Sequence, residues 1–217
     1  MVIIGARGFA KEVLETFHQK NELDDLYFFD NVSLEIPDKL YGQFQIIKDF
    51  AQLAEVFKRD NRFVLGLGNP LIRHKLSQEV KKHGGELVSS TSPLADIGHY
   101  NVYIDKGCNI MSGVRISNSI DIGEGVLINI NCTIGHDTKI GKYSEVSPAA
   151  NISGECYIGD FCNIGTGAIL LPKVKLGDNV TIGAGTIVSK DIPSDTTFAV
   201  AQKKMLWPNQ NKYQPSI

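Results

Sequence analysis

The sequence predicts two domains, a small Rossmann-like α/β domain over residues 1–90 and a parallel β-helix over residues 91–217. Strands and helices alternate in the first part, whereas aliphatic residues recur at every sixth position in the second. Neither an α-helix nor an ordinary strand has this period, which instead indicates short flat sides separated by corners. The recurring aliphatic residues are Ile104, Ile110, Ile116, Ile122, Ile128, Ile134, Ile140, Val146, Ile152, Ile158, Ile164, Leu170, Leu176, Ile182 and Val188.

A second regularity supports the β-helix. Apart from Ile120, the position four residues after each aliphatic residue carries a small or medium-sized side chain, as a narrow interior requires. All four cysteines, Cys108, Cys132, Cys156 and Cys162, occupy this position. We therefore expect reduced thiols that pack as small apolar groups, with zinc binding and disulfide formation as the less favoured alternatives.

Glycine directly follows the aliphatic residue in many repeats, and we expect it to relieve steric crowding where the chain turns a corner. No insertion interrupts the repeat between Ile104 and Val188, so any site must lie on the outer surface of the coils. The glycines at this position are Gly123, Gly135, Gly141, Gly159, Gly165, Gly177 and Gly183.

The first part of the chain contains the elements of a small parallel sheet covered by helices. Residues 2–4 form a short apolar strand, and Ala10, Val13, Leu14 and Phe17 lie on one stripe of the helix that follows. Further strands are expected near residues 27–29, 46–47, 63–68 and 86–88, and further helices from about Asp49 and from Pro70 to His83.

The turn from Gly5 to Gly8 resembles a nucleotide-binding loop, because amides at the start of the next helix can receive a phosphate. Asp30 ends the second strand, where an acid can bind a ribose hydroxyl. The loop reads G-x-x-G rather than the full G-x-G-x-x-G, so a turn that serves packing alone is the alternative that these residues favour. Gly68 and Asn69, after a later strand, mark a second turn that can face a ligand.

His136 is the one histidine in the predicted regular coils, and it lies at an outward corner next to Asp137. An imidazole is a suitable general base near neutral pH, and a neighbouring carboxylate can select its tautomer. A step of eighteen residues stacks Gly154 one coil further along, where a backbone N–H could stabilise an oxyanion. A solvated turn histidine beside a solvated aspartate is the alternative.

The composition excludes several classes of function. A net charge of −2 gives no electrostatic reason to expect nucleic acid or anionic lipid as a partner. The chain has no run of eighteen apolar residues and does not begin with a basic leader, so we expect a cytoplasmic protein that does not insert into a membrane. A zinc enzyme on a β-helix needs converging histidines, and one coil histidine therefore predicts no metal.

These features resemble the hexapeptide-repeat acyltransferases with a left-handed β-helix, and among them the two-domain sugar acetyltransferases of the PglD and NeuD types. The resemblance covers nearly the whole chain, from IIGARGFAKEV through LGLGNPLIRHKL to GHDTKIGKYSEVSPAANISG. It implies an acetyl-CoA-dependent enzyme that forms a homotrimer and acts on a nucleotide-sugar in bacterial surface-glycan synthesis, such as the bacillosamine pathway.

The resemblance also implies roles for individual residues. His136 matches the general base, Asp137 the acid that orients it, and Gly154 the amide that meets the thioester carbonyl. Acetyl-CoA is expected beside Glu145, Gly154, Gly165, Ala168, Gly183 and Ala184, with Lys190, Lys203 and Lys204 as weaker candidates for its phosphates. The nucleotide-sugar is expected at Gly5, Gly8, Phe9, Asp30, Asn31, Gly68 and Asn69.

The chain departs from its relatives at three places. Phe9 and Glu145 stand where relatives carry histidines, and the segment from Phe198 to Lys203 lacks the usual Gly-x-Pro. Contacts to the nucleotide-sugar and to CoA are therefore expected to differ from those of the relatives.

The resemblance predicts N-acetylation of the 4-amino group of a nucleotide-linked 4-amino-4,6-dideoxy sugar, with UDP as the expected nucleotide. The first alternative is O-acetylation of sialic acid or a related sugar by the same base. The second is a non-catalytic trimeric β-helix that binds a nucleotide or acts as a scaffold.

Overall fold

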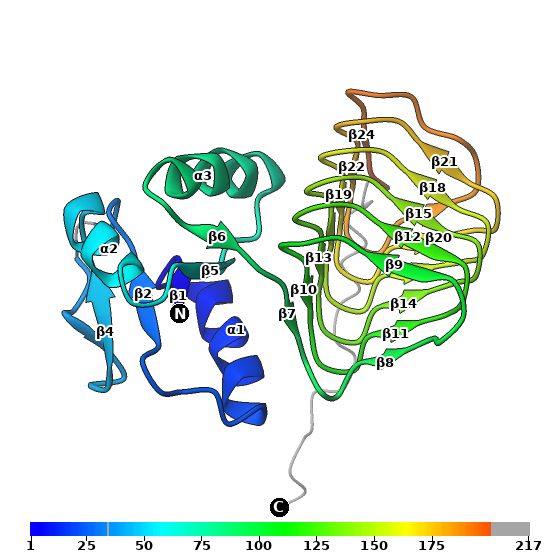
Figure 1. The fold of residues 1–217 in the computed structure, drawn as a ribbon. Coiled ribbons are helices and arrows are strands. Elements are labelled where there is room, and N and C mark those ends of the chain that lie inside the picture. The colour runs from blue at the N-terminus through cyan, green and yellow to red at the C-terminus, as the bar shows by residue number, and fades with distance from the viewer. Residues whose placement is uncertain (34, 201–217) are drawn as a thin grey trace, which may run out of the picture.

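A computed structural model describes residues 1–33 and 35–200, and it contains an α/β domain beside a left-handed β-helix (Figure 1). The predicted fold class is thereby confirmed. No helix within the described ranges combines the length and the apolar character that crossing a membrane requires.

The α/β domain is built on one six-stranded sheet with the order β3-β4-β2-β1-β5-β6. All neighbouring pairs are parallel except β3 and β4, which form an antiparallel edge that the sequence did not predict. The strands are β1 (Val2–Ile4), β2 (Tyr27–Phe29), β3 (Lys39–Leu40), β4 (Phe44–Ile47), β5 (Arg62–Leu65) and β6 (Glu86–Leu87).

Three helices cover the two faces of this sheet: α1 (Gly8–Gln19), α2 (Phe50–Phe57) and α3 (Pro70–Lys82). The predicted stripe of α1 is buried against one face, while α2 and α3 pack on the other. The Asp49 side chain caps α2 by accepting from the Gln52 N–H at 2.8 Å. The Asn69 side chain caps α3 by accepting from the Ile72 N–H at 3.1 Å, directly before Pro70.

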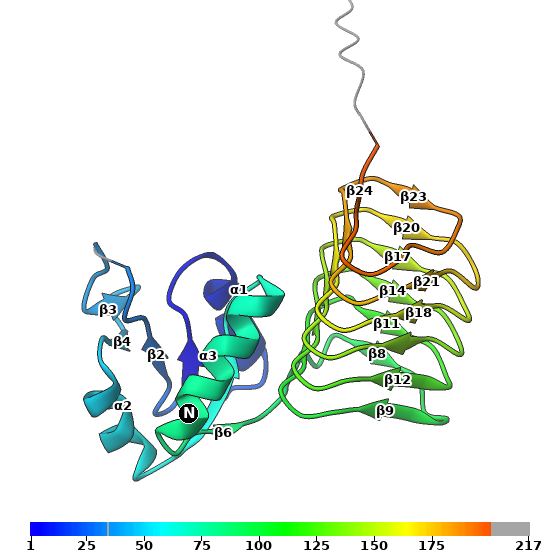
Figure 2. The same cartoon turned by 90° about the horizontal axis from the view of Figure 1, so that it is seen from above.

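The β-helix has three parallel sheets, whose strands stack coil upon coil (Figure 2). The first coil sheet contains β7 (Ser90–Thr91), β10 (Asn109–Ile110), β13 (Leu127–Ile128), β16 (Glu145–Val146), β19 (Asn163–Ile164), β22 (Thr181–Ile182) and β24 (Thr197–Phe198). The second contains β8 (Asp96–Ile97), β11 (Arg115–Ile116), β14 (Thr133–Ile134), β17 (Asn151–Ile152), β20 (Ile169–Leu170) and β23 (Ile187–Val188). The third contains β9 (Val102–Ile104), β12 (Ile120–Ile122), β15 (Lys139–Ile140), β18 (Tyr157–Ile158) and β21 (Lys175–Leu176).

The β-helix begins earlier than the aliphatic repeat indicates. β7 pairs with β10 and β8 with β11, so a coil already forms before Ile104 and includes His99. The sequence missed this coil because Ile97 and Ile104 lie seven positions apart instead of six, and because Thr91 takes the place opposite Ile110.

The coil interior follows the predicted pattern. Every recurring aliphatic residue from Ile110 to Val188 is buried, and all four cysteines lie in the same apolar core. Burial raises the pKa of Cys108 to about 12 and of Cys132 to about 11, so these thiols stay protonated near neutral pH.

The glycines after the aliphatic residues serve a different purpose from the predicted one. The left-handed backbone of each corner falls two residues later, for example at Asp137 with φ 57°. A side chain on Gly135 would instead place its Cβ 2.5 Å from the backbone nitrogen of Gly154 in the next coil. Glycine at this position therefore permits close stacking of coils.

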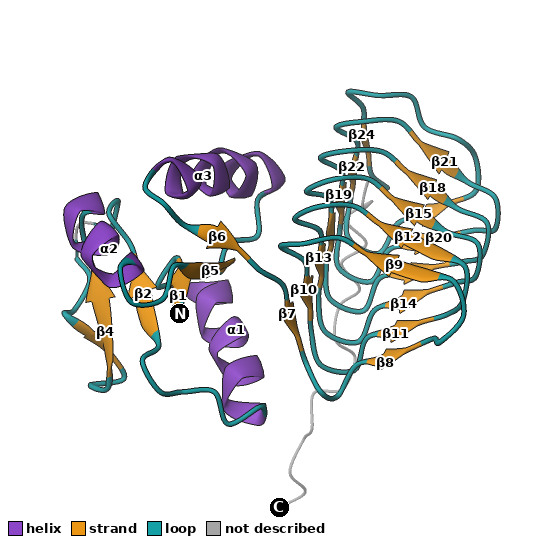
Figure 3. Ribbon diagram, in the orientation of Figure 1, coloured by secondary structure: helices purple, strands orange, loops and turns teal. Residues whose placement is uncertain are grey.

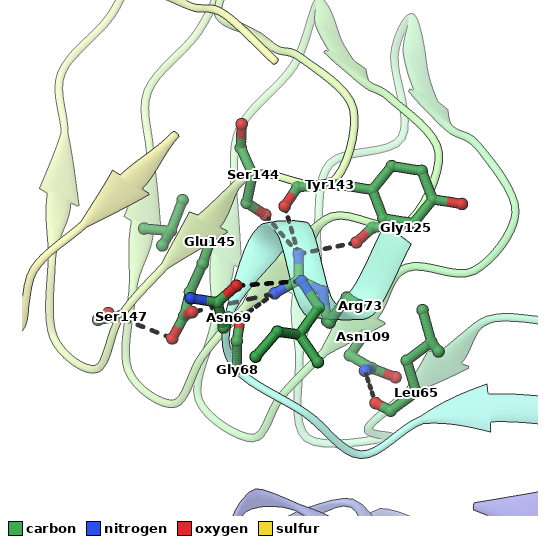
Figure 4. A network of polar contacts seen from close by, with 12 residues as sticks. Leu65, Gly68, Asn69, Arg73, Asn109, Gly125, Tyr143, Ser144, Glu145 and Ser147 are labelled. Carbon is green, nitrogen blue, oxygen red and sulfur yellow. Dashed lines mark hydrogen bonds and ion pairs between the residues drawn. The ribbon is translucent and has the colours of Figure 1, made fainter. Parts of the chain in front are cut away.

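A buried arginine joins the two domains (Figure 4). The Arg73 guanidinium on α3 donates to the main-chain oxygens of Gly68 at 2.5 Å, Gly125 at 2.9 Å, Tyr143 at 2.6 Å and Ser144 at 3.1 Å. Burial lowers the Arg73 pKa to about 10, so the side chain remains a cation near neutral pH. These bonds hold the start of α3 against the corners that enter the first coil sheet.

We expect Ala168→Leu to lower the free energy of unfolding by about 1–3 kcal/mol, because the coil interior has no space for the larger side chain. Chemical denaturation followed by circular dichroism measures this change. Ala184→Leu is the matched control on the outer surface, where a change below about 0.5 kcal/mol is expected. Equal stability of both variants would contradict the packed interior.

We expect Arg73→Lys to destabilise the protein by at least about 2 kcal/mol, since one ammonium cannot reach carbonyls of both domains and some stay unpaired. Thermal unfolding checks this loss. Arg62→Lys removes an exposed guanidinium from Asp60, so it should cost less than about 1 kcal/mol. An Arg73→Lys protein as stable as Arg62→Lys would argue against a junction held by this side chain.

Candidate active site

His136 lies at the corner between β14 and β15, with 62% of its side chain exposed. Its Nδ1 atom is 2.7 Å from Oδ2 of Asp137. A carboxylate only accepts hydrogen bonds, so this pairing places the proton of a neutral imidazole on Nδ1. The Nε2 atom then carries the free lone pair and can take a proton from a substrate.

Gly154 lies directly beside this imidazole, one coil further along. A Cβ on Gly154 would be 2.6 Å from Nε2 of His136, so only glycine leaves the ring in place. Among the described residues, the Gly154 N–H has no hydrogen-bond acceptor. At the comparable corner of Asp160, the backbone N–H donates to the side chain of Asp178 in the next coil at 2.8 Å. At the Gly154 corner the residue in the next coil is Pro172, whose side chain accepts no hydrogen bond. The result is an unused N–H next to a base.

A shallow groove of about 420 Å³ runs over the second coil sheet next to this corner. Its polar lining includes His99, Ser117, Asn118 and Gly135. The groove gives a ligand access to the corner from the side of β14.

The predicted nucleotide loop lies at the switch point of the α/β sheet. In the order β2-β1-β5, the chain passes from β1 to β2 on one side and later to β5 on the other side. The connections that follow β1 and β5 therefore diverge, which opens a crevice at the carboxyl ends of these strands. The loop after β1 and the turn after β5 touch there, since a Cβ on Gly5 would lie 2.8 Å from the Gly66 oxygen. Gly5 has φ 106°, a conformation that favours glycine.

The start of α1 is open to an anion. Its N-cap residue, Arg7, makes no side-chain hydrogen bond to the helix, and nothing lies within 4 Å of the position of a Cβ on Gly8. Uncapped amides at a helix N-terminus bind phosphate well. A groove of about 420 Å³ beside it is lined by Arg7, Val32, Ser33 and Glu35.

Asp30 differs from its predicted role. The carboxylate is 8% exposed and accepts from the Val32 N–H at 3.2 Å, the Ser33 N–H at 2.9 Å and the Ser33 hydroxyl at 2.9 Å. It therefore closes its own loop instead of facing a ribose. Asn31, the neighbouring candidate, is exposed.

Phe9 also has a structural role in this chain. Its partly buried ring packs against both the α/β core and the β-helix core, so it fills the junction between the domains. Of the other predicted residues in this region, Gly68 is partly buried and Asn69 uses its side-chain oxygen to cap α3.

Glu145 lies at the domain junction, away from the His136 corner of its own chain. Its side chain is 13% exposed, and Oε2 is 3.9 Å from Nη1 of Arg73. Burial raises the Glu145 pKa, and the nearby Arg73 charge partly opposes this shift. Sequence reasoning missed Arg73, although it shares a helical stripe with buried Ser77 and Val80. A charged residue on a buried stripe was the available signal.

The remaining candidates for acetyl-CoA binding lie on the upper coils. Gly165 packs on the next coil, with its Cβ position 2.6 Å from the Ala184 nitrogen, and Gly183 packs on Ala199. Ala168 departs from the prediction, because its side chain is fully buried inside the coil and cannot touch a ligand. Ala184 and Lys190 are exposed, while Lys203 and Lys204 lie outside the described residues.

The two halves of the candidate site lie on different sides of one chain. The α/β domain contacts residues such as Asn109, Gly125 and Tyr143, on the first coil sheet and the corner leading into it. The His136 corner joins the second and third coil sheets, and Figure 3 shows β14 and β15 on the side away from the α/β domain. In the part of the chain that the structure describes, no cluster of histidine, cysteine and acidic side chains could hold a metal ion.

Comparison with known proteins agrees with this architecture. Residues 1–80 match the PglD N-terminal domain, and residues 155–190 match the six-repeat bacterial transferase hexapeptide family. No curated protein sequence matches the chain.

Several solved structures share the whole fold. A mutant of GDP-perosamine N-acetyltransferase from Caulobacter crescentus, in complex with CoA and GDP-perosamine, is 27% identical with a TM-score of 0.83, covering 92% of each chain. The acetyltransferase domain of PglB from Neisseria gonorrhoeae is 25% identical with a TM-score of 0.81, covering 92% of this chain and 95% of that one. WeeI from Acinetobacter baumannii is 25% identical with a TM-score of 0.81, covering 90% and 94%.

The predicted resemblance is confirmed by these matches to both domains and to the complete fold. The chain therefore has a PglD-type N-terminal domain followed by a hexapeptide-repeat β-helix, an architecture similar to that of GDP-perosamine N-acetyltransferase and the PglB acetyltransferase domain.

Proposed function

We propose that this protein transfers the acetyl group of acetyl-CoA to the amino group of a nucleotide-linked amino sugar. The observation that carries the proposal is the position of His136 Nε2 directly beside the unused N–H of Gly154. A base and an oxyanion donor at one corner are what direct acyl transfer needs.

The similar proteins of known structure support both proposed substrates, acetyl-CoA and a nucleotide-linked amino sugar. GDP-perosamine N-acetyltransferase was crystallised with CoA and GDP-perosamine, and the PglB domain, 26% identical in that structure, with acetyl coenzyme A. For this chain we propose a 4-amino-4,6-dideoxy sugar of bacterial surface-glycan synthesis as the acceptor. UDP is the first nucleotide to test, and GDP is the competing one that the perosamine complex suggests.

In the proposed reaction, the sugar amine attacks the thioester carbonyl carbon while His136 Nε2 accepts its proton. The Gly154 N–H donates to the oxyanion of the tetrahedral intermediate. Collapse then breaks the carbon–sulfur bond, and the imidazolium returns the proton to the departing CoA sulfur. Asp137 holds the imidazole and stabilises its cation through the 2.7 Å contact at Nδ1.

Direct transfer fits the nucleophiles of this chain better than an acyl-enzyme does. All four cysteines are buried in the coil core, and burial raises the pKa of each thiol. A protonated, enclosed thiol cannot attack a thioester at the surface.

The separation of the two halves of the site supports a homotrimer. We propose that the α/β domain of one chain presents its nucleotide-sugar to the His136 corner of a neighbour, with the diphosphate at the start of α1 and acetyl-CoA between two β-helices. Exposed apolar side chains on the coils offer surface for this contact. They include Leu94, Tyr103, Ile130, Tyr157, Leu171 and Ile187.

We expect His136→Ala to lower kcat by about 10²–10⁴-fold, because it removes the Nε2 atom that accepts the proton beside Gly154. Thiol release from acetyl-CoA, with UDP- and GDP-linked 4-amino sugars and free sialic acid as acceptors, measures the effect. His18→Ala is the control, since His18 is an exposed histidine near the end of α1 and lies outside the groove and the corner.

Release with an amino sugar that disappears only in His136→Ala supports the proposal. Release with sialic acid alone would replace it with O-acetylation, and equal rates in the two variants would remove His136 from the chemistry.

We expect Gly154→Ala to reduce kcat by at least about 100-fold with little change in unfolding temperature, because its Cβ would displace the imidazole while the corner itself can accept alanine. In the His136→Ala background the same change should add a smaller loss, since the ring it displaces is gone. Equal, additive losses in both backgrounds would show that the two residues act independently.

A further inference from the structure

Two glutamates face the junction between the domains, and they differ in how their carboxylates are satisfied. Glu124 accepts from Nζ of Lys81 at 2.7 Å and from the Tyr143 hydroxyl at 2.9 Å. Among the described residues, Glu145 accepts only from the Ser147 hydroxyl, at 3.4 Å. The difference matters because an ionised carboxylate has room for several donors, and buried polar groups are almost always paired.

Arg73 does not fill this gap. Its nearest nitrogen is 3.9 Å from Glu145, beyond hydrogen-bond distance, and its Nη1 and Nη2 atoms donate to main-chain oxygens of both domains. Arg73 therefore balances the charge of Glu145 without using its acceptor capacity (Figure 4). A carboxylate that is 13% exposed keeps free acceptor positions.

The open side of Glu145 adjoins the proposed nucleotide-sugar site. Its Oε2 lies 3.4 Å from the position of a Cβ on Gly68, so the lack of a side chain there leaves space at the carboxylate. Gly68 follows Gly66, which touches the Gly5 turn before α1. A ligand with its phosphates at the start of α1 can therefore extend across the β5 turn toward Glu145.

Glu145 has a polar neighbour on one adjacent strand only, because the fully buried Leu127 pairs with it in register on the preceding coil. Asn163 pairs in register with Glu145 on the adjacent strand, and Ser147 follows two positions along the chain. Asn129, on the coil below, has a side chain that is nearly buried. This small polar surface on the first coil sheet suits a sugar better than it suits an apolar group.

We propose that Glu145 is a specificity-determining residue that accepts hydrogen bonds from the hydroxyl or amino groups of the sugar part of the substrate. The inference rests on the proposed function, because it takes the ligand of the α/β domain to be a nucleotide-sugar. The nucleotide itself is held elsewhere, at the start of α1, so Glu145 contributes to recognition of the sugar and not of the diphosphate.

The test is calorimetric titration of wild type and Glu145→Gln with a nucleotide-linked 4-amino-4,6-dideoxy sugar and with the matching free diphosphate, UDP or GDP. We expect Glu145→Gln to weaken binding of the nucleotide-sugar about tenfold, since a neutral amide is a weaker acceptor than a carboxylate, and to leave diphosphate binding unchanged. A nucleotide-sugar with a hydroxyl in place of the amine shows which donor Glu145 binds. If Glu145 accepts from the amine, Glu145→Gln should weaken binding of the amino sugar more than binding of the hydroxyl analogue.

Glu124→Gln is the matched control, as it alters a junction glutamate whose Oε1 already accepts from Lys81 and from Tyr143. It should change neither titration. Thermal unfolding of both variants checks that the junction is intact, and Glu145→Asp, which retains the charge on a shorter side chain, should bind the nucleotide-sugar more tightly than Glu145→Gln.

Equal weakening of nucleotide-sugar and diphosphate by Glu145→Gln would overturn the inference in favour of a purely structural role. Unchanged binding of both would also overturn it, while leaving the proposed acetyl transfer standing. A wild-type protein that binds no nucleotide-sugar and releases no CoA would overturn the inference and the proposed function together.

Discussion

The step of eighteen residues from one coil to the next is the constraint on which the rest of the structure depends. It requires each large inward aliphatic residue to lie on its counterpart in the neighbouring coil, as Ile116 lies beside Ile134 and Ile134 beside Ile152. The same step stacks outward residues, which brings Gly154 against His136. Core packing and the candidate chemistry are therefore consequences of one register, and a shift of the coils would disturb both.

The second determinant is the buried charge at the junction. Taking a guanidinium out of water costs several kcal/mol, and the structure offsets this cost with hydrogen bonds to carbonyl oxygens of both domains and with Glu145 nearby. Those carbonyls need a donor, because the α/β domain covers them. Arg73 thus links the orientation of the Gly68–Asn69 turn to the coil, and through this turn the proposed nucleotide-sugar site has a defined position on the β-helix.

The coil register and the Arg73 junction together place the α/β domain and His136 on different sides of the β-helix, and this separation bears on the proposed function. The α/β domain occupies the first coil sheet, and His136 lies where the other two sheets meet. The proposed homotrimer would resolve this separation by letting one chain's α/β domain serve another chain's corner. In that arrangement Glu145 would face the sugar from the side of its own chain, while the imidazole would approach from a neighbour.

Sequence reasoning succeeded where residues are related by a regular repeat. The six-residue period identified the coil, the inward cysteines and the stacking of Gly154 on His136. It missed the first coil, because Ile97 and Ile104 lie seven positions apart instead of six and Thr91 stands opposite Ile110. It also misjudged Ala168. The repeat correctly places this side chain in the coil interior, whereas the expected contact with acetyl-CoA required it on the outer surface.

Other residues depend on contacts that no periodic pattern encodes. Asp30 binds its own loop because Ser33 lies within reach, and Phe9 packs into a junction that forms only when the domains meet. Glu145 lies close to Arg73 and Gly68 only because the two domains meet at this junction.

By itself, the sequence determined the coils from Ile104 onward, their register, the α/β elements apart from the β3–β4 edge, and the pairing of His136 with Gly154, since each follows from spacing along the chain. The tertiary structure alone decided which face of the β-helix the α/β domain covers, and with it the roles of Arg73, Glu145 and Phe9. The physical reason is that these contacts join segments far apart in sequence, such as α3 and the corner at Tyr143, whose meeting depends on the shape and polarity of both surfaces.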